Sequence, residues 1–175
     1  MVLLAILPFI FDGILGGLEF YEYVFAIWAV PNPPKPKVTY GEFPFTFVYE
    51  INGVKKIITD TLICEYDGMD TYGGIPNKRR EWKYSFKSGN KILILLQLDG
   101  TNVIYYDIPT YPETQMGDGE PWDGYVSKDA WHYNTKENPN YIGRGYSVSE
   151  EELLNKYAIR IISWEIAPPI ENSFE

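Results

Sequence analysis

The stretch that decides the fold is FPFTFVYEINGVKKII, residues 43–58. Every second residue from 43 to 51 is bulky and apolar, and a period of two indicates a strand with one strongly apolar face. Asn52-Gly53 then predicts a two-residue hairpin turn, because both residues tolerate positive φ. A type I′ turn at this point pairs Ile51 with Val54, Glu50 with Lys55, Val48 with Ile57 and Phe47 with Ile58. Since Glu50 and Lys55 are complementary in charge, the pairing itself supports this register.

Further strands follow along the chain. We expect a second strand over 54–66, a third over 81–86, and one over 92–96 that is apolar on both faces, as in a covered central strand. Asp99-Gly100 predicts a second tight hairpin into 103–106, so that five strands run in meander order. Ser149 and Glu152 form a capping box that starts a short helix, with Leu153, Leu154 and Tyr157 as its buried face. A last strand is expected over 159–166. The sequence thus predicts a mostly β fold, an antiparallel sandwich or curled sheet with one short helix before the last strand.

The first thirty residues are far more apolar than the rest and carry no Lys or Arg. Their length suits a membrane anchor, although Asp12, Glu19 and Glu22 are costly near the centre of a bilayer. A cleaved signal peptide and an amphipathic helix packed on the domain are the alternatives. Residues 31–37 hold four prolines and form an extended spacer. The expected organisation is an apolar membrane-anchor segment at 1–30, a spacer at 31–37 and a single β-rich domain over 38–175.

Composition excludes some classes of function. The net charge of −9 argues against a nucleic-acid partner, which requires a basic surface, and Lys78-Arg79-Arg80 is the only basic cluster. A single cysteine, Cys64, rules out an internal disulfide and a multi-cysteine zinc site. It stands in a strand-like run, where a free thiol behaves as a small hydrophobe. The chain is tyrosine-rich, and an aromatic content of 17% favours β structure.

No catalytic constellation is recognisable in the sequence. Phosphate-binding and dinucleotide fingerprints are absent, and His132 is the only histidine, so no catalytic residue is assigned. Residues 107–129 hold six acidic side chains and one lysine. Within them Asp118, Glu120 and Asp123 stand beside flexible glycines, which is typical of calcium ligands, although the spacing is not that of an EF-hand. A solvated acidic loop without any metal is the alternative.

Aromatic residues of the same region admit a binding surface. Residues 107–146 show little periodicity and are expected to form a long ordered loop. Exposed tyrosine and tryptophan rings form platforms for sugar rings or protein partners, whereas buried ones only anchor the loop. The candidate platform residues are Trp122, Tyr125, Trp131 and Tyr133.

Three stretches resemble a known pattern. They are Tyr40–Phe45 with Tyr49–Gly53, then Asp60–Gly68, and finally Ile161–Glu165 with Pro169–Phe174. Together they resemble a family of small uncharacterised, membrane-anchored proteins of Gram-positive bacteria, to which no activity is assigned. The resemblance implies a domain anchored at the cell membrane and lying outside the cytoplasm, whereas Lys35 and Lys37 after the apolar segment favour a cytoplasmic one. The chain departs from the pattern at its start, where a basic segment is expected.

These observations favour a non-enzymatic, membrane-anchored, extracytoplasmic binding or structural module, with an unidentified protein or glycan as its partner. A calcium-dependent carbohydrate-binding module and a hydrolase of an undetected class are the alternatives. Exposed aromatic rings would favour carbohydrate binding, and a cleft joining His132 to a partner, or two carboxylates to each other, would favour an enzyme.

Overall fold

The computed structural model describes residues 30–71, 78–90, 92–108, 111–120, 126–134 and 145–175. In chain order, its elements are β1 (Tyr40–Ile51), β2 (Val54–Thr71), β3 (Lys78–Phe86), β4 (Leu93–Gln97), β5 (Asn102–Tyr106), α2 (Pro112–Gln115), β6 (Ala130–Asn134), β7 (Tyr146–Val148), α3 (Glu150–Tyr157) and β8 (Ile159–Ile166). The expected apolar segment falls almost entirely on residues 1–29, which lie outside the described residues. In the part of the chain that is described, no helix is long and apolar enough to span a bilayer.

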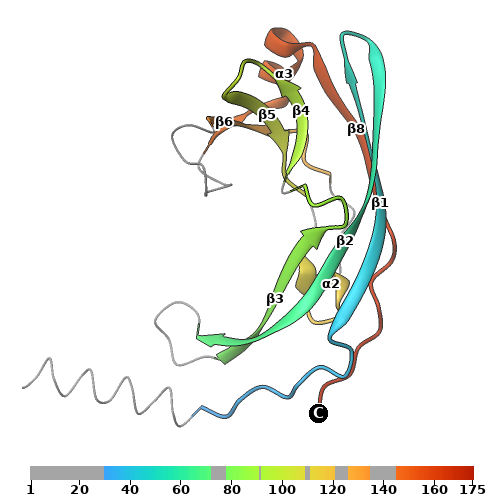
Figure 1. The fold of residues 1–175 in the computed structure, drawn as a ribbon, viewed down its shortest axis with the longest axis vertical. Helices are drawn as coiled ribbons and strands as arrows, with labels where there is room; N and C mark the ends of the chain where they lie inside the picture. Colours follow the sequence, from blue (N-terminus) through green and yellow to red (C-terminus); the bar gives the residue numbers. More distant parts are fainter. Residues whose placement is uncertain (1–29, 72–77, 91, 109–110, 121–125, 135–144) are drawn as a thin grey trace, which may run out of the picture. The chain divides into compact units, whose positions relative to one another are not determined.

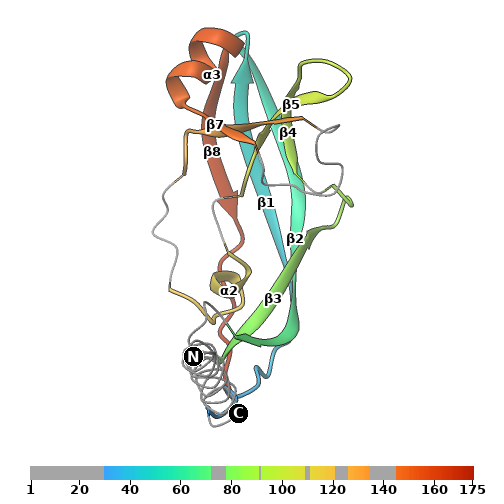
Figure 2. The ribbon, with the colours of Figure 1, turned by 90° about the vertical axis from the view of Figure 1, so that its left-hand side faces the viewer.

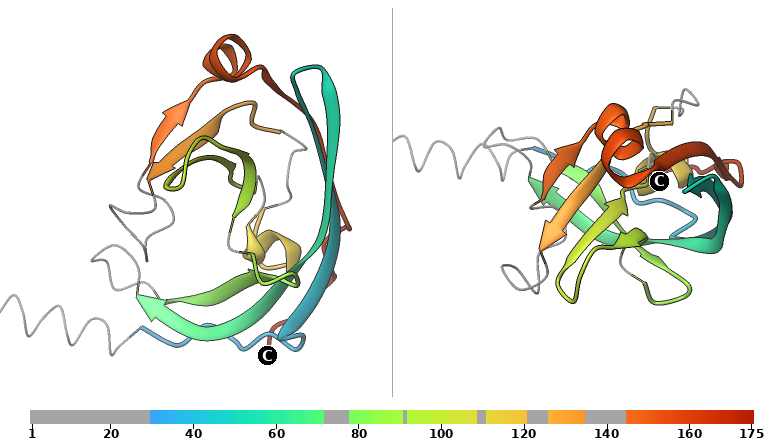
Figure 3. Two further views of the ribbon diagram at one scale, coloured as in Figure 1. Left: turned by 45° about the horizontal axis from the view of Figure 1, so that its top comes forward. Right: turned by 90° about the horizontal axis from the view of Figure 1, so that it is seen from above.

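Two antiparallel sheets make up the fold (Figure 1). The first has the strand order β3-β2-β1-β8 and is strongly curled, as Figure 3 shows. The second has the order β4-β5-β6-β7. The short helix α3 precedes the last strand. The predicted fold class, a mostly β fold with antiparallel, curled sheets and one helix before the last strand, is therefore confirmed.

The β1–β2 hairpin confirms the register expected from the turn. Ile51 pairs with Val54, and Glu50 pairs with Lys55. Asn52 and Gly53 have φ values of 52° and 74°, the two consecutive positive angles that a type I′ turn requires. A residue with a branched Cβ is strained at such angles, which is why Asn-Gly is found at this position.

The expected five-strand meander is broken after the third strand. The chain leaves the first sheet at the end of β3, and β4 and β5 belong to the second sheet. The expectation of a central strand at 92–96 was also wrong, because β4 is an edge strand and Ile94 is 46% exposed. Only one of its faces is covered. A short apolar run does not distinguish an edge strand with one wet face from a strand covered on both faces.

Several elements are longer than the patterns suggested. β2 continues to Thr71 and β3 starts at Lys78, so the basic cluster begins a strand instead of lying in a loop. The region expected to be one long loop, 107–146, contains α2, β6 and the start of β7. Its strands are only five and three residues long. Such strands are held by pairing with neighbours far away in sequence, which local periodicity does not report.

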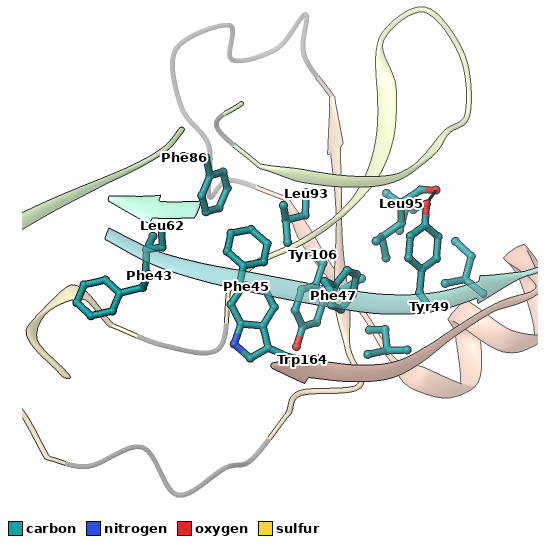
Figure 4. Packing of buried hydrophobic residues seen from close by; sticks show 14 of the residues in the cluster. Phe43, Phe45, Phe47, Tyr49, Leu62, Phe86, Leu93, Leu95, Tyr106 and Trp164 are labelled. Carbon is teal, nitrogen blue, oxygen red and sulfur yellow. Dashed lines mark hydrogen bonds between the residues drawn. The ribbon is translucent and has the colours of Figure 1, made fainter. Parts of the chain in front are cut away.

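The core of the fold is aromatic and lies along one face of β1. Alternation along the strand places Phe43, Phe45, Phe47 and Tyr49 on one face, and all four belong to the core cluster drawn in Figure 4, where each is at most 7% exposed. Phe47 stacks on Tyr106 of β5, with ring centroids 4.5 Å apart. Offset stacking of this kind contributes about 0.5–1.5 kcal/mol beyond the burial of apolar area. The two sheets therefore share one hydrophobic core.

Cys64 belongs to this core. Its side chain is fully buried, and burial raises the pKa of its thiol to about 12. The prediction that it acts as a small hydrophobe is confirmed. A buried thiol that stays protonated is a poor nucleophile.

β8 contains a bulge where it pairs with β1. Val48 pairs with Ser163 and Tyr49 with Ile161, so Ile162 is an extra residue. The ammonium of Lys128 donates to the carbonyl oxygens of Ile161 and Ile162, each at 3.2 Å. Because of the extra residue, Ile161 and Trp164 both enter the core although they are three residues apart.

The helix α3 begins as its capping box predicts. The Ser149 hydroxyl accepts a hydrogen bond from the Glu152 N–H at 3.3 Å. The helix packs beside β8 and β7 (Figure 2) with Leu153 fully buried. Leu154, expected on the buried face, is instead 46% exposed. The helix ends at Ala158, whose φ of 51° turns the chain directly into β8.

The chain divides into two compact units. Of the described residues, the smaller unit contains 30–35, 67–71, 78–81 and 174–175, and the larger contains the remainder. Within the smaller unit, the backbone of Lys35 exchanges two hydrogen bonds with that of Glu175, at 2.8 and 2.9 Å. In the larger unit, the Lys37 N–H donates to the Ser173 carbonyl at 2.8 Å. The proline-rich spacer is thus hydrogen-bonded along the C-terminal tail.

Candidate functional site

The candidate site is a group of polar and aromatic side chains on β6, β7 and α3, which we call the tyrosine–histidine patch. It consists of His132, Tyr146, Glu152, Lys156 and Tyr157. All five belong to the larger unit. Tyr146 pairs with His132 across β7 and β6, and the two rings are stacked with centroids 4.6 Å apart. Tyr146 remains 51% exposed, so the residue is accessible to solvent beside the stacked imidazole.

A glycine makes this ring pair possible. Gly145 directly precedes β7, and a Cβ atom at this position would lie 2.0 Å from the carbonyl oxygen of His132. Any other residue would push β7 away from β6. The absence of a side chain therefore brings Tyr146 opposite His132.

The helix α3 supplies the charged and hydroxyl groups of the patch. Lys156 donates to the Glu152 carboxylate at 3.0 Å, an i,i+4 pair on the helix surface. Its ammonium also lies 5.0 Å from the centroid of the Tyr157 ring. The side-chain hydrogen bond to Tyr157, followed by that to Glu152, raises the pKa of Lys156 and further favours its charged form.

Tyr146 is linked electrostatically to the same group. Partial desolvation raises the pKa of Tyr146, and the neighbouring Tyr157 adds to the rise. Both effects favour the neutral phenol, which donates and accepts hydrogen bonds. The patch therefore offers one exposed aromatic face surrounded by two hydroxyls, an ammonium and a carboxylate.

The aromatic residues proposed from the sequence are distributed differently. Trp122 and Tyr125 lie outside the described residues. Trp131 and Tyr133 are on β6, where alternation places them on the face opposite His132. Tyr133 is 5% exposed and meets Tyr105 edge-to-face at 6.2 Å, whereas Trp131 is partly buried. These two rings pack with Val103 and Tyr105 of the neighbouring strand β5 and are not brought together with the patch.

The proposed calcium ligands are not seen as a set. Asp118 accepts a hydrogen bond from the Trp82 indole at 2.8 Å, Glu120 is exposed, and Asp123 lies outside the described residues. Within the described ranges, no three His, Cys, Asp or Glu side chains come close enough to hold a metal ion. Calcium binding stays a prediction.

No catalytic arrangement accompanies His132 in the part of the chain that is described. Its ring contacts Tyr146, and no described serine or carboxylate bonds to it. A groove of about 470 Å³ runs over another part of the larger unit, across β2, β1 and β8. Asp60, on its wall, is held by the Ser88 hydroxyl and by backbone N–H groups. None of the described residues that line the groove presents an exposed aromatic ring; they are Pro44, Phe45, Thr46, Thr59, Asp60, Glu165, Ile166 and Ala167.

The patch could not be found from the sequence, because its members come from β6, β7 and α3 and are joined by the pairing of β6 with β7. Local periodicity does not report which strands pair. Two local signals were present: Gly145 before Tyr146, and Glu152 four residues before Lys156. Neither identifies the strand partner of Tyr146. Comparison with known proteins adds no relative, since no protein family, curated protein or solved structure matches the chain.

Proposed function

We propose that the protein is a non-enzymatic glycan-binding module, anchored in the cell membrane by residues 1–30 with its β-rich domain outside the cytoplasm. The observation that carries the proposal is the half-exposed Tyr146, whose ring stacks on that of His132 and lies near hydrogen-bonding groups of α3. The resemblance to membrane-anchored proteins of Gram-positive bacteria supports the proposed location.

The chemistry of the patch suits a neutral pyranose. One face of such a sugar presents axial C–H groups, which pack on an aromatic ring, while its equatorial hydroxyls need donors and acceptors at the rim. Tyr157, Lys156 and Glu152 supply both kinds of group. Because Lys156 and Glu152 form an ion pair, they balance each other in charge. That balance favours a neutral sugar over a uronate or a sugar phosphate.

The test of binding uses the full chain in nanodiscs and isothermal titration with cello-oligosaccharides and N-acetylglucosamine oligomers. Tyr146→Ala removes the platform and should weaken binding by roughly 1–2 kcal/mol, about 5- to 30-fold in Kd. Tyr84→Ala is the matched control, because Tyr84 is 47% exposed on β3 and lies outside the patch. Equal losses in the two variants, or no binding by the unaltered chain, would refute glycan binding at this patch.

Anchoring is tested separately. The full chain should remain with membranes after extraction with alkaline carbonate, whereas a chain restricted to residues 38–175 should be released. Release of both would refute the anchor without affecting the sugar-binding experiment.

A further inference from the structure

The first sheet has an outer face, which is the side of β1 opposite its aromatic row. β2, β1 and β8 lie side by side in this sheet (Figure 2), and their registers fix which residues share that face. Three neighbouring rows cross it from β2 over β1 to β8, all within the larger unit. They are a cationic row of Lys55, Glu50 and Arg160, an apolar row of Ile57, Val48 and Ser163, and a groove row of Thr59, Thr46 and Glu165.

The apolar row in the middle is partly open to solvent. Ile57 is 59% exposed, and Ile162, the extra residue of the bulge next to Ser163, is 41% exposed. Val48 lies on the central strand of this row and is 8% exposed, although alternation places it on the face away from the core. Single exposed apolar residues need no explanation, whereas adjoining ones on neighbouring strands mark a contact surface. The apolar row therefore presents a small surface for a partner.

The rows on either side of the apolar row carry opposite charge. In the cationic row, Lys55 and Arg160 flank Glu50, so two cations and one anion leave one positive charge. In the groove row, Glu165 is the one charged side chain. Lys55, Arg160 and Glu165 are all exposed, and among the described residues no ion pair joins any of them to another side chain. Their charges are therefore available to a partner.

The groove of about 470 Å³ opens on the groove row. Thr46, Thr59 and Glu165 line it, together with Pro44 and Ala167. The Ala167 N–H donates to the Pro44 carbonyl at 2.9 Å, but Pro44 has no N–H to donate to the Ala167 carbonyl in exchange. The groove thus contains the Glu165 carboxylate and a carbonyl oxygen that receives no hydrogen bond from the facing strand residue. Both are acceptors for a cationic side chain.

We propose that a second copy of the chain binds to this outer face, and that each copy inserts Arg160 into the groove of the other, beside Glu165. A two-fold axis through the apolar row and perpendicular to the strands places Ile57 against the partner's Ile57 and Arg160 against the partner's Glu165. Because such an interface is isologous, both ion pairs form at once. An axis parallel to the strands would instead place Arg160 against the partner's Lys55, which repels it. The pairing requires neither the membrane anchor nor the sugar patch.

The paired face is small. Three strands about 4.8 Å apart and three rows about 6.6 Å apart give a face of roughly 14 by 20 Å, or roughly 300 Å² per copy. Stable complexes bury about 800 Å² per partner, so this pairing is weak and transient. Sheets that pack face to face use no free edge. The contact is therefore compatible with the bulge that interrupts the edge of β8.

Disulfide trapping of the full chain in mild detergent measures a contact of this kind. Ile57→Cys places two thiols next to each other at the two-fold axis, and Cys64 does not compete because it is fully buried. Val54→Cys is the matched control, since Val54 is 55% exposed on the opposite face of the same strand. With copper phenanthroline as the oxidant, Ile57→Cys should form linked dimers at least about fivefold faster than Val54→Cys, because pairing raises the effective concentration of its thiols.

Charge exchange tests the pairing of Arg160 with Glu165. In the Ile57→Cys background, Arg160→Glu and Glu165→Arg each place like charges together and should slow linking by about fivefold or more. A mixture of the two variants restores both ion pairs between unlike chains. The mixed dimer, identified by its mass, should therefore form within about twofold of the parent rate. Recovery in the mixture also shows that each variant is folded.

Equal rates for Ile57→Cys and Val54→Cys would overturn the proposal, because random collisions link both positions alike. Association through residues 1–30, or another protein in the groove, would also give this result. The comparison of the two cysteines needs no charge variant, so it decides the proposal even if Arg160→Glu fails to fold. A mixture that stays as slow as either variant alone, while both variants keep the parent Tm, would overturn the pairing of Arg160 with Glu165.

Discussion

Asn172 should be the residue on which attachment of the C-terminal tail depends. Its side-chain oxygen accepts from the N–H groups of Val38 and Ser173, at 3.0 and 2.9 Å. Its amide nitrogen donates to the carbonyl oxygens of Val38 and Met116, at 2.9 and 3.0 Å. One half-buried amide therefore joins the start of the domain, the end of α2 and the tail.

The magnitude follows from the surroundings of these bonds. The bonds to Val38 and Ser173 are exposed and contribute a few tenths of a kcal/mol each, while the partly buried bond to the Met116 carbonyl contributes about 1 kcal/mol. Asn172→Ala should therefore lower the free energy of unfolding by about 2 kcal/mol. Asn172→Asp keeps the acceptor but turns a carboxylate oxygen toward two carbonyls, so its loss should be at least as large at neutral pH.

Thermal unfolding of the full chain in mild detergent, followed by circular dichroism, measures this effect. For a chain of this length, 2 kcal/mol corresponds to about 4–8 °C in Tm. Glu171→Ala is the control, an exposed neighbour whose side chain makes no hydrogen bond to a described residue. If Asn172→Ala and Glu171→Ala both shift Tm by less than about 1 °C, the backbone pairs of the tail hold it without Asn172, and the reasoning is wrong.

Three further predictions concern the hairpin, the thiol and the acidic region. Replacing Asn52 by Ala and Gly53 by Val exchanges two residues that tolerate positive φ for two that do not, which should lower stability by roughly 1–3 kcal/mol; an unchanged urea midpoint would contradict the type I′ turn. Cys64 should resist a thiol reagent at pH 8 until urea unfolds the chain. Because its folded pKa of about 12 exceeds the unfolded value of about 8.5, stability should also fall as pH rises between these values, and rapid labelling of the folded chain would refute both statements. If the acidic region binds calcium, millimolar CaCl₂ should raise Tm more than MgCl₂ or matched NaCl, by linkage worth about 2.7 kcal/mol at 100 times Kd. Asp118→Asn with Asp123→Asn should abolish the rise, and equal shifts in all salts would exclude the site.

The elements predicted correctly are those whose signals are local. The β1–β2 register follows from Asn52-Gly53, because a two-residue loop leaves one pairing. The helix start follows from Ser149, and β8 ends where Pro168 begins to interfere. In each case the deciding residues lie within a few positions of one another.

The errors concern choices made by distant parts of the chain. The chain passes from the first sheet to the second between β3 and β4, where the second sheet covers the aromatic face of β1. No residue near position 90 indicates this change of sheet, because it depends on packing against β1. For the same reason the face of β4 toward solvent was assigned to the core. Of the proposed aromatic platform, Trp131 and Tyr133 lie in a small cluster on one face of the second sheet, and Trp122 and Tyr125 lie outside the described residues, so the platform stays a prediction. Tyr146 was overlooked because it stacks on His132 only through the pairing of β6 with β7, which the sequence does not show.

The bulge in β8 has a consequence for the behaviour of the protein at high concentration. β8 is an edge strand, and an open edge is a template on which a second chain can add a strand. At the bulge the ammonium of Lys128 already occupies two successive carbonyl groups, and the extra residue interrupts the regular spacing of the backbone groups. An incoming strand would have to displace this ammonium and bury its charge. Lys128 and the extra residue Ile162 therefore disfavour the addition of a second chain to the edge strand β8, and with it edge-to-edge aggregation.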